Sequence, residues 1–253
     1  MKKIKLKWIM LFILYVLQAS LCTSIQAEDR VLSGKVIIVD PGHGGFDPGK
    51  PGIHGEDEKH INLKIALLLK NYLESSGATV VMTRTTDDDV DGMDGVKHKS
   101  KDMVERKKLS EGGDILVSIH QNSFTQSSVH GAQTFYNEKS DKGKKLAETI
   151  QSTIKTYTDE TNRRQAKSNT NYYVLKATKM PAVIVECGFL TNPEEEQKLN
   201  SEAYQDKMAY GIYQGVIKYF EEQVEENQKL QPKTECFLKI IELFHRFEQV
   251  IHY

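Results

Sequence analysis

Three short apolar runs, each leading to a polar residue, form the clearest pattern along the chain. Residues 36–39 are four β-branched residues in succession, and residues 115–119 and 182–185 are similarly apolar. Runs of this length and composition are typical of buried strands. The first run leads through a Gly-rich turn to His43, and the other two lead directly to His120 and Glu186. Because the carboxyl ends of strands in an α/β sheet are where such folds bind ligands, these three side chains are expected to form one site.

Between these runs, apolar residues recur at spacings of three or four and predict helices. Helices are expected over residues 57–75, 103–110, 141–157 and 203–220, with one more beginning at Pro193. Gly77 is expected to cap the first of them. Further strands are expected at residues 79–83, 131–136 and 172–175, and exposed loops at residues 85–101 and 162–171. This alternation predicts a single α/β domain whose mixed, mostly parallel sheet has about six strands and helices on both faces.

The first 27 residues have the three parts of a secretory signal. Four lysines precede an apolar run over residues 8–21, and Ala27 is a small residue before a polar start. The apolar run is shorter than the roughly 20 residues that a spanning helix needs. A cleaved signal peptide is therefore favoured over an uncleaved anchor.

Charge and cysteine content narrow the class of protein further. Without the four leader lysines, the formal net charge of −1 becomes −5. This acidic balance argues against nucleic acid as the main partner. Only Cys187 and Cys236 lie beyond the leader, so an exported form would have no disulfide framework and would depend on its core for stability.

Two histidines at strand ends suggest a metal, and a catalytic zinc site of this kind needs one further carboxylate. Glu56, Asp57 and Glu58 are the candidates. Glu58 precedes Ile61 and Ile65 by three and seven residues, which places it on the helix face turned toward the sheet. Taken singly, each of the two histidines could be an ordinary hydrogen-bonded residue. Glu58 could be an acid that the dipole favours at a helix N-terminus. A carboxylate at position 186, directly after four apolar residues, is costly to bury without a partner, which favours a functional role.

These residues occur within longer motifs. The motifs are DPGHGG at residues 40–45, Glu58-Lys59 followed by Asn62-Leu63, SIHQN at residues 118–122 and VECGFLTN at residues 185–192. In this order, they resemble the zinc-dependent N-acetylmuramoyl-L-alanine amidases, bacterial cell-wall hydrolases, over about residues 34–220. The resemblance implies that His43, Glu58 and His120 bind one Zn²⁺ and that Glu186 is the catalytic carboxylate.

The finer resemblance is to the germination-specific, spore-cortex branch of this family. It rests on GAQTFY at residues 131–136 and IYQGVIKYF at residues 212–220. The implied substrate is peptidoglycan, cut between N-acetylmuramic acid and L-alanine on the way to muramic-δ-lactam. The alternatives are an inactive peptidoglycan-binding module and an amidase of the vegetative wall or of daughter-cell separation. A zinc peptidase acting on protein is disfavoured because neither HExxH nor its inverse is present.

Residues 34–221 are thus expected to be the catalytic domain, exported to the cell wall or the forespore intermembrane space. Residues 222–253 lie beyond the resemblance and are expected to form a polar linker and an amphipathic C-terminal helix of open role. The helical stripe comprises Phe237, Ile240, Ile241, Phe244 and Ile251. It would pack on its own domain, a targeting or activating protein partner, or a membrane surface. Membrane attachment is otherwise expected only through an uncleaved leader.

Overall fold

The computed structural model describes residues 31–88, 90 and 99–230. The expected leader and the expected amphipathic C-terminal helix lie outside these residues. In chain order the elements are β1 (Val36–Pro41), α2 (Glu58–Ser75), β2 (Thr79–Met82), α3 (Lys99–Leu109), β3 (Ile115–Asn122), β4 (Gln133–Tyr136), α4 (Asp141–Thr158), β5 (Lys167–Ser168), α5 (Tyr173–Ala177), β6 (Ala182–Phe189), α6 (Pro193–Leu199) and α7 (Glu202–Leu230). Among the described helices, none has the length and apolar content that crossing a membrane requires.

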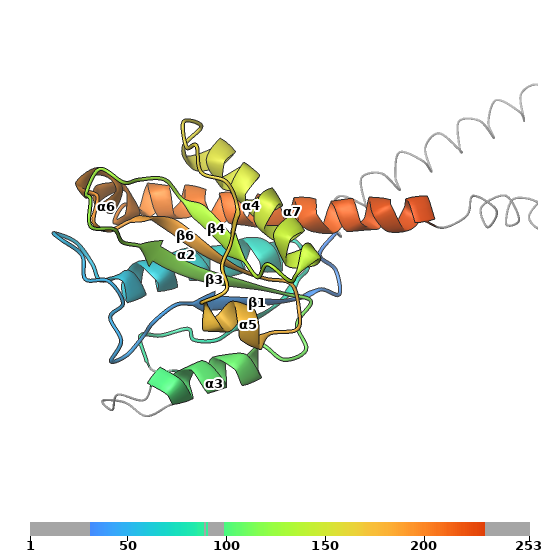
Figure 1. The fold of residues 1–253 in the computed structure, drawn as a ribbon. Coiled ribbons are helices and arrows are strands. Elements are labelled where there is room, and N and C mark those ends of the chain that lie inside the picture. The colour runs from blue at the N-terminus through green and yellow to red at the C-terminus, as the bar shows by residue number, and fades with distance from the viewer. Residues whose placement is uncertain (1–30, 89, 91–98, 231–253) are drawn as a thin grey trace, which may run out of the picture.

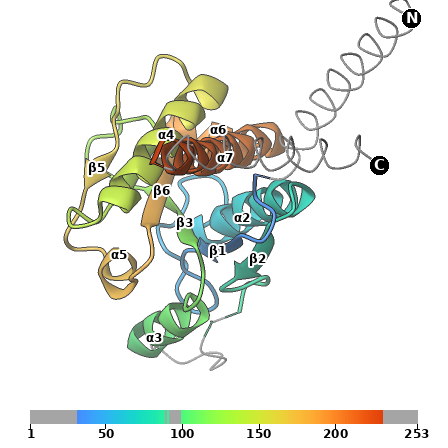
Figure 2. The same cartoon turned by 90° about the vertical axis from the view of Figure 1, so that its right-hand side faces the viewer.

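One six-stranded sheet with the order β2-β1-β3-β6-β4-β5 forms the centre of the domain (Figure 1). All neighbouring strands run parallel except β4 and β6, which are antiparallel. Helices α2, α4 and α7 cover one face, and α3 and α5 lie on the other (Figures 1 and 2). The predicted fold class is therefore confirmed.

The two faces of the sheet bury different cores because successive side chains of a strand point in opposite directions. Ile37 and Val39 belong to the larger core under α2, α4 and α7, whereas Ile38 belongs to the smaller core beside α5. By the same alternation, Asp40 and Glu186 lie on the α3 and α5 side. This placement decides which elements can reach the polar ends of the strands.

Close helix packing encloses the larger core. Helix α7 lies directly on α4 at Gly215, where a Cβ atom would come within 2.5 Å of the Cα of Ile150. On α2 the fully buried stripe is Ile61, Ile65, Leu69 and Leu73. The expected helix is present and ends at Ser75; Ser76 is its C-cap, and Gly77 follows with a positive φ of 88°. Leu68 and Tyr72 lie at the margin of this stripe and are only partly buried.

The prediction of a strand at residues 172–175 is wrong, because these residues begin the short helix α5. A short run of aromatic and β-branched residues fits either structure by periodicity alone. The spacing of Tyr172 and Leu175 places both on one face of a helical turn, where they pack into the smaller core. The sixth strand is instead β5, within the segment expected to be a loop.

Two helices are longer than expected. Helix α3 begins at Lys99 rather than Met103, so it takes in the end of the expected loop. Helix α7 continues past Phe220 to Leu230. Lys145 of α4 pairs with Glu222 and Glu226 along this extension, which gives the polar segment a surface to pack on.

Candidate active site

Strands β1, β3 and β6 are neighbours and end at the same edge of the sheet. Pro41 pairs with Ile119, and His120 pairs with Glu186. His43 follows β1 by two residues, and Glu58 is the first residue of α2. The structure therefore brings together all four residues predicted from the sequence, in one groove.

Three of these residues form a compact set of donor atoms. Oε1 of Glu58 lies 3.2 Å from Nε2 of His43 and 3.0 Å from Nδ1 of His120. One donor atom from each residue lies within 4.8 Å of the others. Glu58 is buried, and the two imidazoles are only partly exposed. Two imidazoles converging on one carboxylate oxygen can hold a divalent metal ion.

The backbone at His43 adopts a conformation that is rare for a residue with a side chain. Its φ is +62°, in the left-handed region. The ring is fixed by Asp47, whose Oδ2 lies 2.9 Å from Nδ1 and leaves Nε2 for Glu58. A strained residue of this kind persists only where its surroundings hold it, and such residues cluster at functional sites.

Two buried arginines hold the turn that carries His43. Arg106 donates to the carbonyl oxygens of Pro41 and His43 at 2.9 and 2.6 Å. Arg84 donates to the carbonyl oxygens of Pro41 and Gly42, both at 3.0 Å. Three successive carbonyl groups thus point at guanidinium groups, which accounts for the stability of the left-handed turn.

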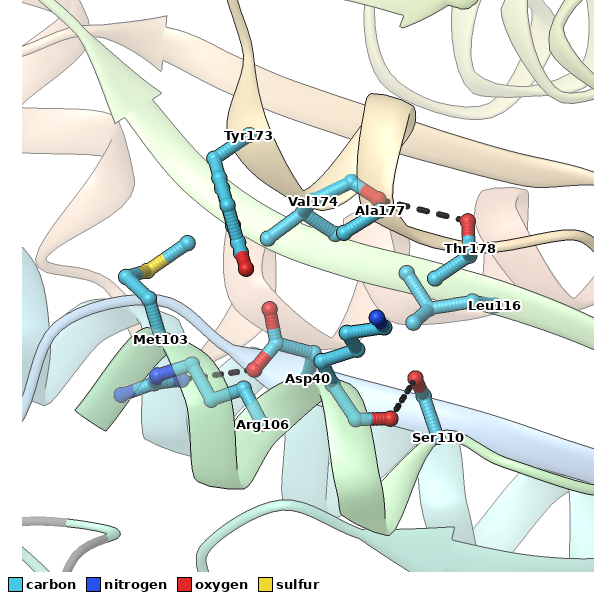
Figure 3. A pocket seen from close by; sticks show the side chains of 10 residues that line it. Asp40, Met103, Arg106, Ser110, Leu116, Tyr173, Val174, Ala177 and Thr178 are labelled. Carbon is cyan, nitrogen blue, oxygen red and sulfur yellow. Dashed lines mark hydrogen bonds and ion pairs between the residues drawn. The ribbon is translucent and has the colours of Figure 1, made fainter. Parts of the chain in front are cut away.

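Asp40 anchors Arg106 from the strand side. Figure 3 shows Arg106 of α3 directed at the carboxylate of Asp40, across a narrow pocket from Tyr173 of α5. The Arg106–Asp40 distance is 2.6 Å, and the hydroxyl groups of Ser118 and Thr83 also donate to this carboxylate. Burial alone would raise the pKa of Asp40, but Arg106 and the two hydroxyl groups outweigh it and lower the pKa to about 2.

The sequence did not predict that Asp40, Arg84 and Arg106 support the turn that carries His43. One signal was available, because a carboxylate that ends a buried strand needs a cation. With 34 lysines and arginines in the chain, however, the sequence could not indicate which cation that is.

Gly42 is required by the packing of the site. A Cβ atom at this position would lie 2.2 Å from the ring of His120. The carbonyl oxygen of Gly42 also accepts a hydrogen bond from Asn62 at 3.0 Å, which ties the turn to α2. The glycine therefore allows β1 and β3 to bring their two histidines together.

Glu186 is buried beside this donor set, and its two carboxylate oxygens differ. Oε1 accepts a hydrogen bond from the hydroxyl of Tyr172 at 3.1 Å. Oε2 is buried and has no hydrogen-bond partner within the part of the chain that the structure describes. Burial raises the pKa of Glu186, and the nearby charge of Glu58 adds to this effect. A buried carboxylate with one unused oxygen and a raised pKa is typical of a catalytic acid–base group.

A groove of about 380 Å³ connects these residues. Its walls include His43, Glu58, His120, Asn122, Tyr172 and Glu186. This volume lies within the roughly 300–1,000 Å³ of ligand pockets. The groove can therefore admit part of a substrate to the donor set and to Glu186.

Cys187 is predicted to be neither a metal ligand nor a nucleophile. It is fully buried in the larger core, on the opposite face of β6 from Glu186. Burial raises the pKa of its thiol, so it stays protonated. We expect Cys187→Ala to keep its metal content and activity and to lose about 1 kcal/mol of stability. Elemental analysis and thermal melting would measure this, and loss of metal from a folded variant would contradict it.

The comparison with known proteins agrees with this geometry. Residues 37–218 match the protein family described as N-acetylmuramoyl-L-alanine amidase. The chain belongs to this family. It is 37% identical over 231 residues to the germination-specific N-acetylmuramoyl-L-alanine amidase of Bacillus subtilis (strain 168), a match covering 86% of this chain and 96% of that relative. It is also 35% identical over 189 residues to the amidase LytC of the same organism, covering 74% of this chain and 36% of LytC.

Solved structures give the same result. The CwlD amidase from Clostridioides difficile, in complex with the GerS lipoprotein, matches with a TM-score of 0.69 and 38% identity. That match covers 74% of this chain and 99% of CwlD. The amidase AmiC2 of Nostoc punctiforme matches with a TM-score of 0.63 and 32% identity over 75% of this chain and 99% of AmiC2. The predicted family and enzyme class are thereby confirmed, including the resemblance to the germination-specific branch.

Proposed function

We propose that this amidase is a zinc-dependent hydrolase in which Glu186 transfers a proton from the attacking water to the leaving nitrogen. It would cut the amide bond between N-acetylmuramic acid and L-alanine in peptidoglycan. The observation that carries the proposal is the unpartnered oxygen of Glu186, buried beside the donor set of His43, Glu58 and His120. A buried carboxylate oxygen without a hydrogen bond is costly in a purely structural role.

The donor set fits Zn²⁺ because imidazole nitrogens and one carboxylate are common ligands of catalytic zinc. His43, Glu58 and His120 would hold the ion. Zinc bound there would polarise the amide carbonyl and make a water molecule more acidic. Asp47 would keep Nε2 of His43 turned toward the ion, in the way that carboxylates orient metal-binding histidines.

Glu186 would act first as a base and then as an acid. Its Oε2 takes a proton from the attacking water, whose oxygen forms a bond to the lactyl carbonyl carbon. The carboxyl group then gives this proton to the nitrogen as the carbon–nitrogen bond breaks, and L-alanine leaves with a free amino group. The raised pKa of Glu186, caused by burial, suits both steps because the group can hold the proton between them.

Zinc affinity should increase with pH, because His43 has to release a proton to bind the metal. Burial alone would lower the pKa of His43, but Asp47 and Glu58 outweigh it and raise the pKa to about 9. Proton and metal then compete below about pH 9. We expect affinity to rise about tenfold per pH unit from about pH 7 to about pH 9, and to level off above. Chelator competition with metal-stripped protein would measure this.

Asp47→Asn provides the control for this pH dependence. Because Asp47 raises the pKa of His43, the variant should reach its plateau at a lower pH. An affinity that stays constant between about pH 7 and about pH 9 would contradict the protonation of His43.

The activity itself is tested with purified peptidoglycan. We expect the protein to release new amino groups of L-alanine, detected by labelling of N-terminal amines. An inactive wall-binding module would bind the sacculi and release none. A zinc peptidase acting on protein would cleave casein and leave the peptidoglycan unchanged.

We further propose a role in the spore cortex. The support is the 37% identity to a germination-specific amidase over most of both chains. Removal of stem peptides would precede formation of muramic-δ-lactam. Muropeptides from spores of a deletion strain should lack this lactam. An unchanged spore cortex together with a defective vegetative wall would instead favour a role in vegetative growth or daughter-cell separation.

A protein partner and export complete the proposal. The CwlD structure contains the GerS lipoprotein, which supports a lipoprotein-like targeting or activating partner for this chain. We propose that residues 1–27 direct export and that residues 34–221 act on the wall or in the forespore intermembrane space. The sequence of the leader supports the first point. The apolar stripe beyond residue 231 would pack on its own domain, on a protein partner or on a membrane surface.

A further inference from the structure

Tyr172 lies beside the proposed general base, Glu186. It precedes α5, and its hydroxyl is 3.1 Å from Oε1 of Glu186. Its ring packs edge-to-face on Phe135 of β4, with ring centroids 5.6 Å apart. Phe135 in turn pairs with Ile184 of β6. Both ends of the Tyr172–Glu186 hydrogen bond are therefore fixed by the same two strands.

The backbone before α5 fixes Tyr172 further. The side chain of Asn169 accepts hydrogen bonds from the backbone N–H groups of Asn171 and Tyr172, at 2.7 and 3.3 Å. The N–H of Asn169 donates to the carbonyl oxygen of Tyr136 at 2.8 Å. The tyrosine is thus anchored to the end of β4, and its hydroxyl has little freedom to leave Glu186.

This hydrogen bond makes the two oxygens of Glu186 unequal. Oε1 has a donor, whereas Oε2 has none among the described residues. If the carboxyl group could rotate freely, either oxygen would meet the water and the base would lose its alignment. A fixed donor on one oxygen leaves the other in a defined position.

We propose that Tyr172 is a positioning residue for hydrolysis, whose hydroxyl holds Oε1 of Glu186 so that Oε2 accepts the proton from water. The inference rests on the proposed role of Glu186 as general base. Burial and the charge of Glu186 raise the pKa of Tyr172, so its hydroxyl stays protonated and remains a donor. The hydroxyl itself transfers no proton in this scheme.

The test is Tyr172→Phe, which keeps the ring and its packing on Phe135 and removes only the hydroxyl. With a soluble muropeptide, we expect kcat to fall about tenfold or more, because a hydrogen bond to a charged group is lost. KM should stay within about twofold and zinc content should be unchanged. Tyr157→Phe is the matched control, because Tyr157 is 40% exposed on α4, across the sheet from the groove. It should have wild-type kcat.

A double variant separates positioning from general stabilisation. In a Glu186→Gln background, Tyr172→Phe should cause no further loss of kcat, since its effect acts through the carboxylate. Equal losses in both backgrounds would overturn the inference, as would a wild-type kcat or a loss confined to KM. These results would leave the amidase proposal intact. Failure of the wild-type protein to free L-alanine would overturn both.

Discussion

Glu186→Gln is expected to bind zinc normally and to lose about 10²–10⁴-fold in kcat. The amide has nearly the same shape as the carboxylate and can still accept the hydrogen bond from Tyr172 through its oxygen. It cannot take a proton from water at neutral pH. The lost step is therefore proton transfer, while the residues of the metal site are unchanged. Steady-state kinetics on a soluble muropeptide and elemental analysis would measure the two effects separately.

Glu148→Gln is a suitable control for this experiment. Glu148 is an exposed residue of α4 and lies 3.9 Å from Lys144 in a surface ion pair, which contributes little. The control should match the wild-type protein in zinc content and kcat. If Glu186→Gln retained near-normal turnover, Glu186 would be a structural residue and the mechanism proposed above would be wrong.

His120→Ala is expected to lose zinc and activity together. Nδ1 of His120 lies 3.0 Å from Oε1 of Glu58. Without His120, only Glu58 and His43 of the donor set would remain. Changing a residue that merely supports a metal ligand costs about 10–100-fold in affinity, so removing a ligand should cost at least as much. Because metal bound to the folded state stabilises it, zinc should raise the melting temperature of the wild-type protein and not that of the variant.

His130→Ala distinguishes this result from a general effect of losing a histidine. His130 is exposed, and its Nδ1 lies 3.0 Å from the carbonyl oxygen of Ser128 in the same loop. The control should keep both zinc and turnover. Full zinc occupancy in a folded His120→Ala variant would contradict the assignment of His120 as a metal ligand.

Local sequence patterns determined much of what is known about this protein. Apolar runs and helical spacing predicted an α/β domain and five of its six strands, because side-chain periodicity follows from backbone geometry. The motifs around His43, Glu58, His120 and Glu186 identified the family. The convergence of these residues could also be predicted, since the carboxyl ends of neighbouring parallel strands meet at one edge.

Tertiary structure alone decided how these residues are held. The sequence around Tyr172 is equally compatible with a strand and a helix. Packing against the smaller core favours the helical turn, which brings the hydroxyl of Tyr172 to Glu186. Arg106 pairs with Asp40, which lies 66 residues earlier in the chain, and both side chains are buried. The left-handed backbone of His43 depends on these arginine contacts. Such choices depend on long-range packing and on the desolvation of buried charges, which no local pattern of residues encodes.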